Sequence, residues 1–170
     1  MDLHNKWKKT AYLGVFLAAA MICSYIETLI PINFGIPGIK LGLANIVVLL
    51  MLYLVGAKEA FAVSMVRVVL TGLLFGNIFS VVYSLSGAIL SFIVMVLLKK
   101  NDRLLCVSVS TAGGISHNIG QLLAASLMVY DFHVMFYVPV LLIAGLITGL
   151  LIGFLAQELL IRLGPVMGND

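Results

Sequence analysis

The chain has 170 residues, of which 62% are hydrophobic and 10% are charged, and its formal net charge is +3. Soluble domains carry roughly 25% charged residues, so this composition cannot cover a water-facing surface and excludes a soluble globular protein. The sequence therefore predicts an all-α integral membrane protein with a single domain over residues 1–170, and the small positive charge does not indicate a nucleic-acid partner.

Six apolar runs follow one another along the chain. Short segments that contain Gly, Pro or charged residues separate them, and such segments end helices. About 17–25 residues cross a bilayer, and the second and third runs are at the short end of this range. We therefore expect six transmembrane helices, at residues 10–30, 39–55, 60–75, 78–98, 104–130 and 134–161. Lysines precede the first run, but no small-residue cleavage site follows it, so we expect no signal peptide.

Lysine and arginine residues set the predicted orientation. The basic residues that flank the runs are Lys6, Lys8, Lys9, Lys58, Lys99, Lys100, Arg103 and Arg162. All of them lie at the N-terminus, in the second and fourth loops, or at the C-terminus. Because cytoplasmic loops carry an excess of Lys and Arg, we expect both termini in the cytoplasm of a multi-pass protein of the cell membrane.

Arg67 is the most unusual residue of the third run. It lies in the middle of an apolar stretch with no acidic residue within one helical turn. A charged side chain at the bilayer centre costs roughly 2.5–3.5 kcal/mol on insertion scales. Such a residue is normally retained only where it faces a cavity, a ligand or a buried partner, and the predicted orientation places Arg67 near mid-membrane.

Further polar residues gather in the predicted outer half of the membrane. Together with Arg67, the candidate substrate contacts are Glu27, Lys40, Asn45, Asn77, Ser84, His117, Asn118 and Gln121. Inside hydrocarbon each polar group must be paired, hydrated in a cavity or bound to a ligand. Their convergence therefore predicts a cavity for a small-molecule substrate. Lys40 and Arg67 outweigh Glu27 in charge, which suits a carboxylate or phosphate group on that molecule.

Structural interpretations of the same residues stay open. Glu27 could form an ion pair with Lys40 or Arg67. The polar residues Asn45, Ser84 and Gln121 could make interhelical hydrogen bonds, which are often worth well under about 1 kcal/mol each. A single histidine such as His117 is more often a packing residue than a ligand contact.

Small residues mark expected helix contacts. Gly145, Gly149 and Gly153 recur at every fourth position of the sixth run, which predicts close packing inside the bundle. The first run contains Ala18, Ala19 and Ala20, which suit a partner surface and internal packing equally well.

The sequence lacks motifs for nucleotide hydrolysis, for magnesium binding and for metal coordination by cysteine. No phosphate-binding loop is present, so this chain cannot hydrolyse ATP alone. The aspartates lie singly at termini and in loops, where no two can hold magnesium on a diphosphate: Asp2, Asp102, Asp131 and Asp170. Cys23 and Cys106 lack metal-ligand spacing. We therefore expect no enzymatic activity, no metal and no cofactor.

Three stretches carry a resemblance to a known family. They are residues 36–45 (IPGIKLGLAN), 64–76 (SMVRVVLTGLLFG) and 116–121 (SHNIGQ). With them, nearly the whole chain resembles the Gx transporter family, which is also labelled heptaprenyl diphosphate synthase component I. This family is similar to the substrate-binding S components of energy-coupling factor (ECF) transporters.

The resemblance implies an architecture and a set of partners. S components have six helices, both termini inside, and a first loop that closes over an outward-facing site. Here that loop would contain Pro31, Asn33, Phe34 and Pro37. In ECF transporters an alanine-rich first helix of the S component contacts a transmembrane coupling subunit, and two ATPase subunits supply the energy. By resemblance, Ala18, Ala19 and Ala20 would form this partner interface here. The implied function is uptake of a small vitamin-like or precursor molecule.

Two other functions stay open. The older family label suggests a membrane subunit or anchor associated with heptaprenyl diphosphate synthase and isoprenoid quinone synthesis. The chain lacks the aspartate pairs of such a synthase, and its predicted inner loops are short, so it could at most anchor a catalytic partner or pass it a substrate. The second alternative is a stand-alone secondary transporter.

Overall fold

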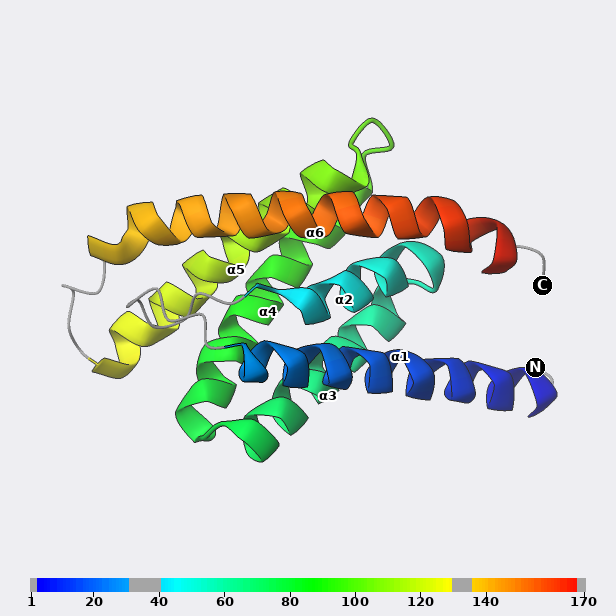
Figure 1. The fold of residues 1–170 in the computed structure, drawn as a ribbon, viewed down its shortest axis with the longest axis horizontal. Coiled ribbons are helices and arrows are strands. Elements are labelled where there is room, and N and C mark those ends of the chain that lie inside the picture. Colours follow the sequence, from blue (N-terminus) through cyan, green and yellow to red (C-terminus); the bar gives the residue numbers. More distant parts are fainter. Residues whose placement is uncertain (1–2, 31–40, 130–135, 168–170) are drawn as a thin grey trace.

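The computed structural model describes residues 3–30, 41–129 and 136–167 (Figure 1). These residues form six α-helices, which confirms the predicted all-α class and, for the described residues, the number of helices. The helices are α1 (Leu3–Leu29), α2 (Leu43–Leu54), α3 (Ala57–Phe75), α4 (Ile78–Lys99), α5 (Cys106–Val129) and α6 (Val138–Met167).

Contacts between the helices form a closed ring. Around this ring the order is α1, α2, α6, α5, α4 and α3, and α3 packs in turn against α1. In addition, α2 packs against α3. The start of α1 and the end of α6 lie at the same end of the molecule (Figure 1). In this part of α1, Lys9 donates a hydrogen bond to Glu59 of α3, which lowers the pKa of the Glu59 carboxyl below its ordinary value.

The shortest helix, α2, lies between two glycines. Gly42 precedes it with a φ of 77°, and Gly56 follows it with a φ of 142°. Both values lie in the region that glycine adopts readily because it has no Cβ atom. The backbone N–H groups of Gly42 and Leu43 donate hydrogen bonds to the carboxylate of Glu27 in α1. A carboxylate from another helix therefore accepts hydrogen bonds from the backbone N–H groups at the start of α2.

A basic side chain from another helix holds the opposite end of α2. Lys99, the last residue of α4, donates a hydrogen bond through Nζ to the backbone carbonyl of Leu52. The same Nζ atom lies 4.9 Å from the centroid of the Tyr53 ring. A cation is favourable at this end because the carbonyl groups of a helix C-terminus carry partial negative charge.

Glycines allow α5 and α6 to approach each other closely. A Cβ atom added at Gly149 would lie 2.7 Å from Cα of Thr111, and one added at Gly145 would lie 2.8 Å from the carbonyl oxygen of Gly114. At Gly153 the added atom would lie 2.7 Å from Cα of Val107. These three glycines of α6 therefore pack inside the bundle, as the sequence predicted.

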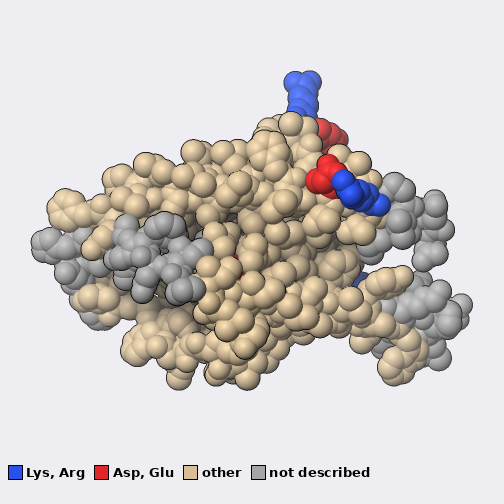
Figure 2. All heavy atoms as spheres, viewed as in Figure 1, with Lys and Arg blue, Asp and Glu red and all other residues tan. Residues whose placement is uncertain are grey.

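The apolar surface of the molecule identifies a membrane protein. Trp7, Leu73 and Leu127 are 74%, 65% and 73% exposed, and apolar side chains on each of the helices α1, α3, α4, α5 and α6 are exposed in the same way. Figure 2 shows that the visible charged side chains gather toward the end where α1 begins and α6 ends, and most of the remaining face is uncharged. An apolar surface of this extent is unfavourable in water and favourable in lipid.

Three helical segments are long and apolar enough to cross a membrane by themselves. They are Lys9–Leu29, Ile78–Lys99 and Val138–Gly164. The helix α2 is apolar but shorter.

The close contact between α5 and α6 generates a prediction for Gly149→Ala. The added methyl group meets backbone atoms, so the two helices must separate, and overpacking of this kind typically costs about 1–3 kcal/mol. We expect a lower midpoint of thermal unfolding in detergent. The matched control is Gly14→Ala, because a Cβ atom at Gly14 has no atom within 4 Å and no loss of stability should follow. Equal midpoints for Gly149→Ala and the unmodified protein would contradict the packing described here.

Candidate functional site

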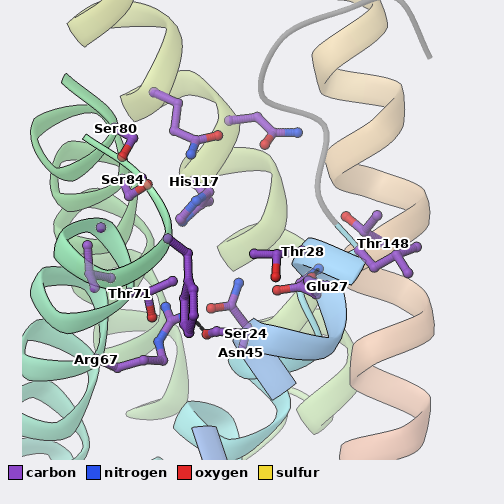
Figure 3. Close-up of a pocket in the computed structure, with 18 of the residues that line it drawn as sticks. Ser24, Glu27, Thr28, Asn45, Arg67, Thr71, Ser80, Ser84, His117 and Thr148 are labelled. Carbon is purple, nitrogen blue, oxygen red and sulfur yellow. Dashed lines mark hydrogen bonds between the residues drawn. The ribbon is translucent and has the colours of Figure 1, made fainter. Parts of the chain in front are cut away.

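A cavity of about 340 Å³ opens between the helices, away from the end that carries the charged surface residues. This volume lies within the range of about 300–1,000 Å³ that is typical of small-molecule sites. All six helices contribute to its wall, and Figure 3 shows their polar side chains pointing toward a common space. The polar lining residues are Ser24, Glu27, Thr28, Asn45, Arg67, Thr71, Ser80, Ser84, His117, Asn118, Gln121 and Thr148.

Most of the predicted site residues lie in this wall. The structure brings together Glu27, Asn45, Arg67, Ser84, His117, Asn118 and Gln121. Another predicted contact, Asn77, is not a lining residue. Its side chain accepts a hydrogen bond of 2.8 Å from the backbone N–H of Ser80 and thereby caps the start of α4. Lys40 and the predicted loop residues Pro31, Asn33, Phe34 and Pro37 lie outside the described residues.

Arg67 is buried in the cavity wall. Its side chain comes from the middle of α3 and is 8% exposed. Nη1 donates a hydrogen bond of 3.2 Å to the hydroxyl oxygen of Ser24, which is drawn in Figure 3. Nε is buried and has no hydrogen-bond partner among the described residues. The guanidinium group therefore keeps one buried N–H donor without a partner among the described residues.

Glu27 and Arg67 make no direct ion pair, although the negative charge of Glu27 still favours the charged guanidinium group at longer range. Within the part of the chain that the structure describes, the ion pairs join Lys9 to Glu59 and Arg162 to Glu158. The Oε1 atom of Glu27 instead accepts hydrogen bonds from the backbone at the start of α2, at 2.9 Å from the nitrogen of Leu43. Negative charge is stabilised there because the first N–H groups of a helix have no partner within the helix. Glu27 therefore joins the end of α1 to the start of α2.

The α5 wall of the cavity carries two side-chain amides with different surroundings. Asn118 donates a hydrogen bond of 2.7 Å through Nδ2 to the backbone carbonyl of Leu141 in α6. Gln121 is 1% exposed, and its Oε1 atom has no hydrogen-bond partner among the described residues. Most buried polar atoms in proteins are hydrogen-bonded, so this acceptor is an exception among the described residues.

Five polar lining residues were missed by the sequence analysis: Ser24, Thr28, Thr71, Ser80 and Thr148. Spacing could have revealed some of them. Thr71 lies four residues after Arg67, and Ser80 lies four residues before Ser84, so each pair shares a helix face. Thr148 has no such neighbour, and its position between packing glycines gave no signal for a cavity.

The alanines of the first run differ in their exposure. Ala18 is exposed, Ala19 is half-buried and Ala20 is completely buried. A partner surface on α1 can therefore include Ala18 and Ala19, whereas Ala20 already packs inside the bundle.

The fold and the cavity define a helical membrane protein with an internal polar site. Residues 16–159 match the family described as heptaprenyl diphosphate synthase component I, and this chain belongs to that family. No curated protein matches the chain. No solved structure matches it either.

The unpaired state of Arg67 generates a prediction for Arg67→Met. Replacing a buried charge by an apolar side chain of similar volume is often neutral or stabilising. We expect washed, ligand-free protein to keep or raise its unfolding midpoint. Removal of one partner of a buried ion pair instead costs about 3–5 kcal/mol, so a large loss would show that Arg67 has a structural counter-ion. Arg162→Met is the control, because Arg162 lies in an exposed pair with Glu158 and should change stability little.

The contact between Glu27 and α2 generates a separate prediction. Glu27→Gln keeps a side-chain oxygen that can accept from the backbone of α2, whereas Glu27→Ala leaves these partly buried donors without that acceptor. An unsatisfied buried donor costs about 1–3 kcal/mol. Thermal unfolding should therefore show a clear loss for Glu27→Ala and a small one for Glu27→Gln. If both substitutions lowered the unfolding midpoint equally, Glu27 would stabilise the protein through its charge and not through hydrogen bonds to the start of α2.

Proposed function

We propose that this protein is the substrate-binding membrane subunit, or S component, of an ECF-type importer for a small vitamin-like or precursor molecule. The observation that carries the proposal is the cavity of about 340 Å³, which is lined by polar side chains from all six helices. A concave site with a few convergent polar groups is suited to binding a small molecule. Among the described residues no group of three or more His, Cys, Asp or Glu side chains could hold a metal ion, and we propose no enzymatic activity.

The proposed topology has six membrane crossings with both termini in the cytoplasm of a cell-membrane protein. The flanking lysines and arginines support this orientation, as does the shared location of the two helix ends in Figure 1. In that orientation the cavity lies toward the outer side, because it is bordered by the end of α1, the start of α2 and the hairpin between α3 and α4. The site is then placed to capture a molecule from outside the cell.

Import requires partners, because a binding subunit alone does not move its substrate against a gradient. We propose a transmembrane coupling subunit that contacts α1 at Ala18 and Ala19, and two ATPase subunits that drive reorientation. Small exposed side chains support such a contact, because they allow another helix to approach closely.

The family description favours a second candidate, a membrane subunit associated with heptaprenyl diphosphate synthase. In this case the chain would hold a soluble catalytic partner at the membrane or pass it a substrate. The short segments that join α2 to α3 and α4 to α5 offer little surface for such a partner, so we rank this candidate second.

Affinity purification from the native membrane tests the two candidates. We expect a coupling subunit and an ATPase pair to copurify, whereas a prenyl synthase would support the second candidate. Ala18→Phe should abolish copurification of the coupling subunit because its ring obstructs close approach, while the protein stays folded. Leu127→Phe is the control, since Leu127 is 73% exposed on α5, away from the proposed contact. Substrate uptake by the isolated chain in liposomes would instead indicate a stand-alone transporter.

A further inference from the structure

We propose that the cavity has a side portal to the outer leaflet of the membrane, between α1 and α3, and that its ligand is an amphiphile that enters through this portal. The portal is closed by the rings of Tyr25 and Phe75, whose centroids lie 5.4 Å apart. The inference rests on the proposed topology and binding function, and it adds a route and a class of ligand to them.

The two helices of the portal lie side by side in a constant register. Three side-chain contacts between α1 and α3 join residues that are 50 positions apart in the chain. They are Lys9–Glu59, Met21–Thr71 and Tyr25–Phe75. A constant separation means that the two helices run parallel and aligned along this length. The ion pair at one end of the seam therefore gives a reference level for the ring pair at the other end.

The ring pair lies within the hydrocarbon core of the membrane. The distance from Glu59 to Phe75, as from Lys9 to Tyr25, is 16 residues, or about 24 Å at a helical rise of about 1.5 Å per residue. Charged side chains at helix ends lie at the boundary of the core, which is about 30 Å thick. The rings are then at most about 24 Å from the inner boundary, and helix tilt shortens this distance. They therefore lie at the depth of the acyl chains of the proposed outer leaflet.

The ring pair separates the cavity from the lipid at this depth. Phe75 lines the cavity, whereas Tyr25 is not a lining residue and is 46% exposed. Ile22 and Ile26 of α1 and Leu74 of α3 are exposed and apolar, so this face of the seam suits contact with acyl chains. Two aromatic side chains therefore form the wall between the cavity and the leaflet.

The short helix α2 does not support the rings from behind. It packs against both α1 and α3, but its 12 residues extend only about 18 Å from the Gly56 end, where it joins α3. Its first residues line the cavity. The inner part of the seam is thus backed by a helix, whereas the level of the rings is backed by the cavity.

Side-chain rotation is sufficient to open this seam. At the level of the rings the contact between α1 and α3 joins two side chains, and exposed side chains change rotamer without movement of the backbone. Glycines hold other seams of the cavity more closely. Between α3 and α4, a Cβ atom added at Gly72 would lie 2.2 Å from Cγ2 of Val81, and glycines likewise bring α5 against α4 and α6. The seam between α1 and α3 therefore opens with less rearrangement than these.

The route through lipid selects the class of ligand. A purely polar molecule loses its hydration in hydrocarbon, so it does not approach from the acyl chains. A molecule with an apolar chain or ring system concentrates in the leaflet and reaches the portal by lateral diffusion. The cavity of about 340 Å³ can hold the polar group of such a molecule, while the apolar part lies toward Phe75 and the portal. A small amphiphile meets these conditions.

The first experiment tests the location of the portal without a ligand. Trp7 is the single tryptophan of the chain, so Tyr25→Trp in a Trp7→Phe background places one fluorophore at the seam. In vesicles of phosphatidylcholine with brominated acyl chains we expect strong quenching, and aqueous iodide should quench little. Ile93→Trp in the same background is the control for an exposed, lipid-facing position on α4. Quenching by iodide without quenching by the brominated lipid, or no quenching by either, overturns the portal.

The second experiment tests the ligand and its route. Protein is purified from its native membrane, immobilised in detergent and washed with ligand-free micelles for increasing times. The molecule that remains bound is released by denaturation, separated between chloroform and water, and identified by accurate-mass spectrometry. We expect it in the chloroform phase. Size-exclusion chromatography quantifies the folded protein of each variant, so a variant that fails to fold is recognised.

Two variants weaken the closed portal. Phe75→Ala and Tyr25→Ala should each release the molecule about 2–10 times faster, because an aromatic pair contributes about 0.5–1.5 kcal/mol and about 1.4 kcal/mol corresponds to a factor of ten. Tyr25 does not line the cavity, so its effect cannot come from a lost contact with a ligand inside it. The matched controls are Phe79→Ala and Tyr12→Ala, which change exposed residues of α4 and α1 outside the cavity wall and should leave the rate unchanged.

The outcomes separate this inference from the proposed function. Recovery of the molecule in the water phase alone overturns the amphiphile and leaves a binding subunit standing. Equal release rates for all variants also overturn the inference. Faster release from Phe75→Ala but not from Tyr25→Ala would make Phe75 a ligand contact and not part of a portal, which overturns it as well. If the unmodified protein releases no molecule above the level from protein-free resin, the binding function itself fails, and the inference fails with it.

Discussion

The cavity depends on the contact between Glu27 and the start of α2. With 12 residues, α2 is about 18 Å long, whereas the hydrocarbon core of a bilayer is about 30 Å thick. A helix this short cannot span the core, and its first N–H groups are partly buried at the wall of the cavity. In lipid such groups must find partners within the protein, and the Glu27 carboxylate supplies the acceptor. Leu41, Gly42 and Asn45, at the start of α2, line the cavity.

The opposite wall is built by a different interaction. The helices α4, α5 and α6 approach each other through glycines, with Gly87 facing Gln121 and Gly149 facing Thr111. Close backbone contact replaces long side chains there, so polar groups such as Ser110 can reach the neighbouring helix, and its hydroxyl donates a hydrogen bond of 2.8 Å to the carbonyl of Gly149. Dispersion contacts between close-packed surfaces stabilise helix association in membranes, where the hydrophobic effect between helices is weak. On this side, the cavity wall is therefore held together by close backbone contacts between helices.

The sequence revealed the class of the fold and seven of the twelve polar residues in the cavity wall. Apolar runs interrupted by Gly, Pro and charge predicted six helices, because these breaks are local and chemically distinct. Arg67 and Gln121 stood out because polar side chains are rare in such runs. Asn77 stood out for the same reason, yet it caps α4, and residue type and depth alone cannot separate a cap from a cavity contact. That distinction requires the local backbone geometry.

The partners of polar residues were harder to predict. The sequence suggested an ion pair between Glu27 and a basic side chain, because charged side chains can be read from a sequence. The backbone N–H groups that Glu27 accepts from cannot be recognised in this way. The hydroxyl residues of the wall other than Ser84 were missed, because Ser and Thr in helices often bond to their own backbone, as Thr111 does with the carbonyl of Val107. A hydroxyl in an apolar run therefore carries little information about whether it faces a site.

The hydrogen bonds at the start of α2 also bear on the order in which the protein is made. Glu27 is synthesised before Gly42 and Leu43, so the acceptor is already present when the ribosome releases the donors. Lys99, which holds the other end of α2, is synthesised 47 residues after Leu52. During biosynthesis α2 can therefore anchor to α1 first, and its second end is secured only after α4 has entered the membrane.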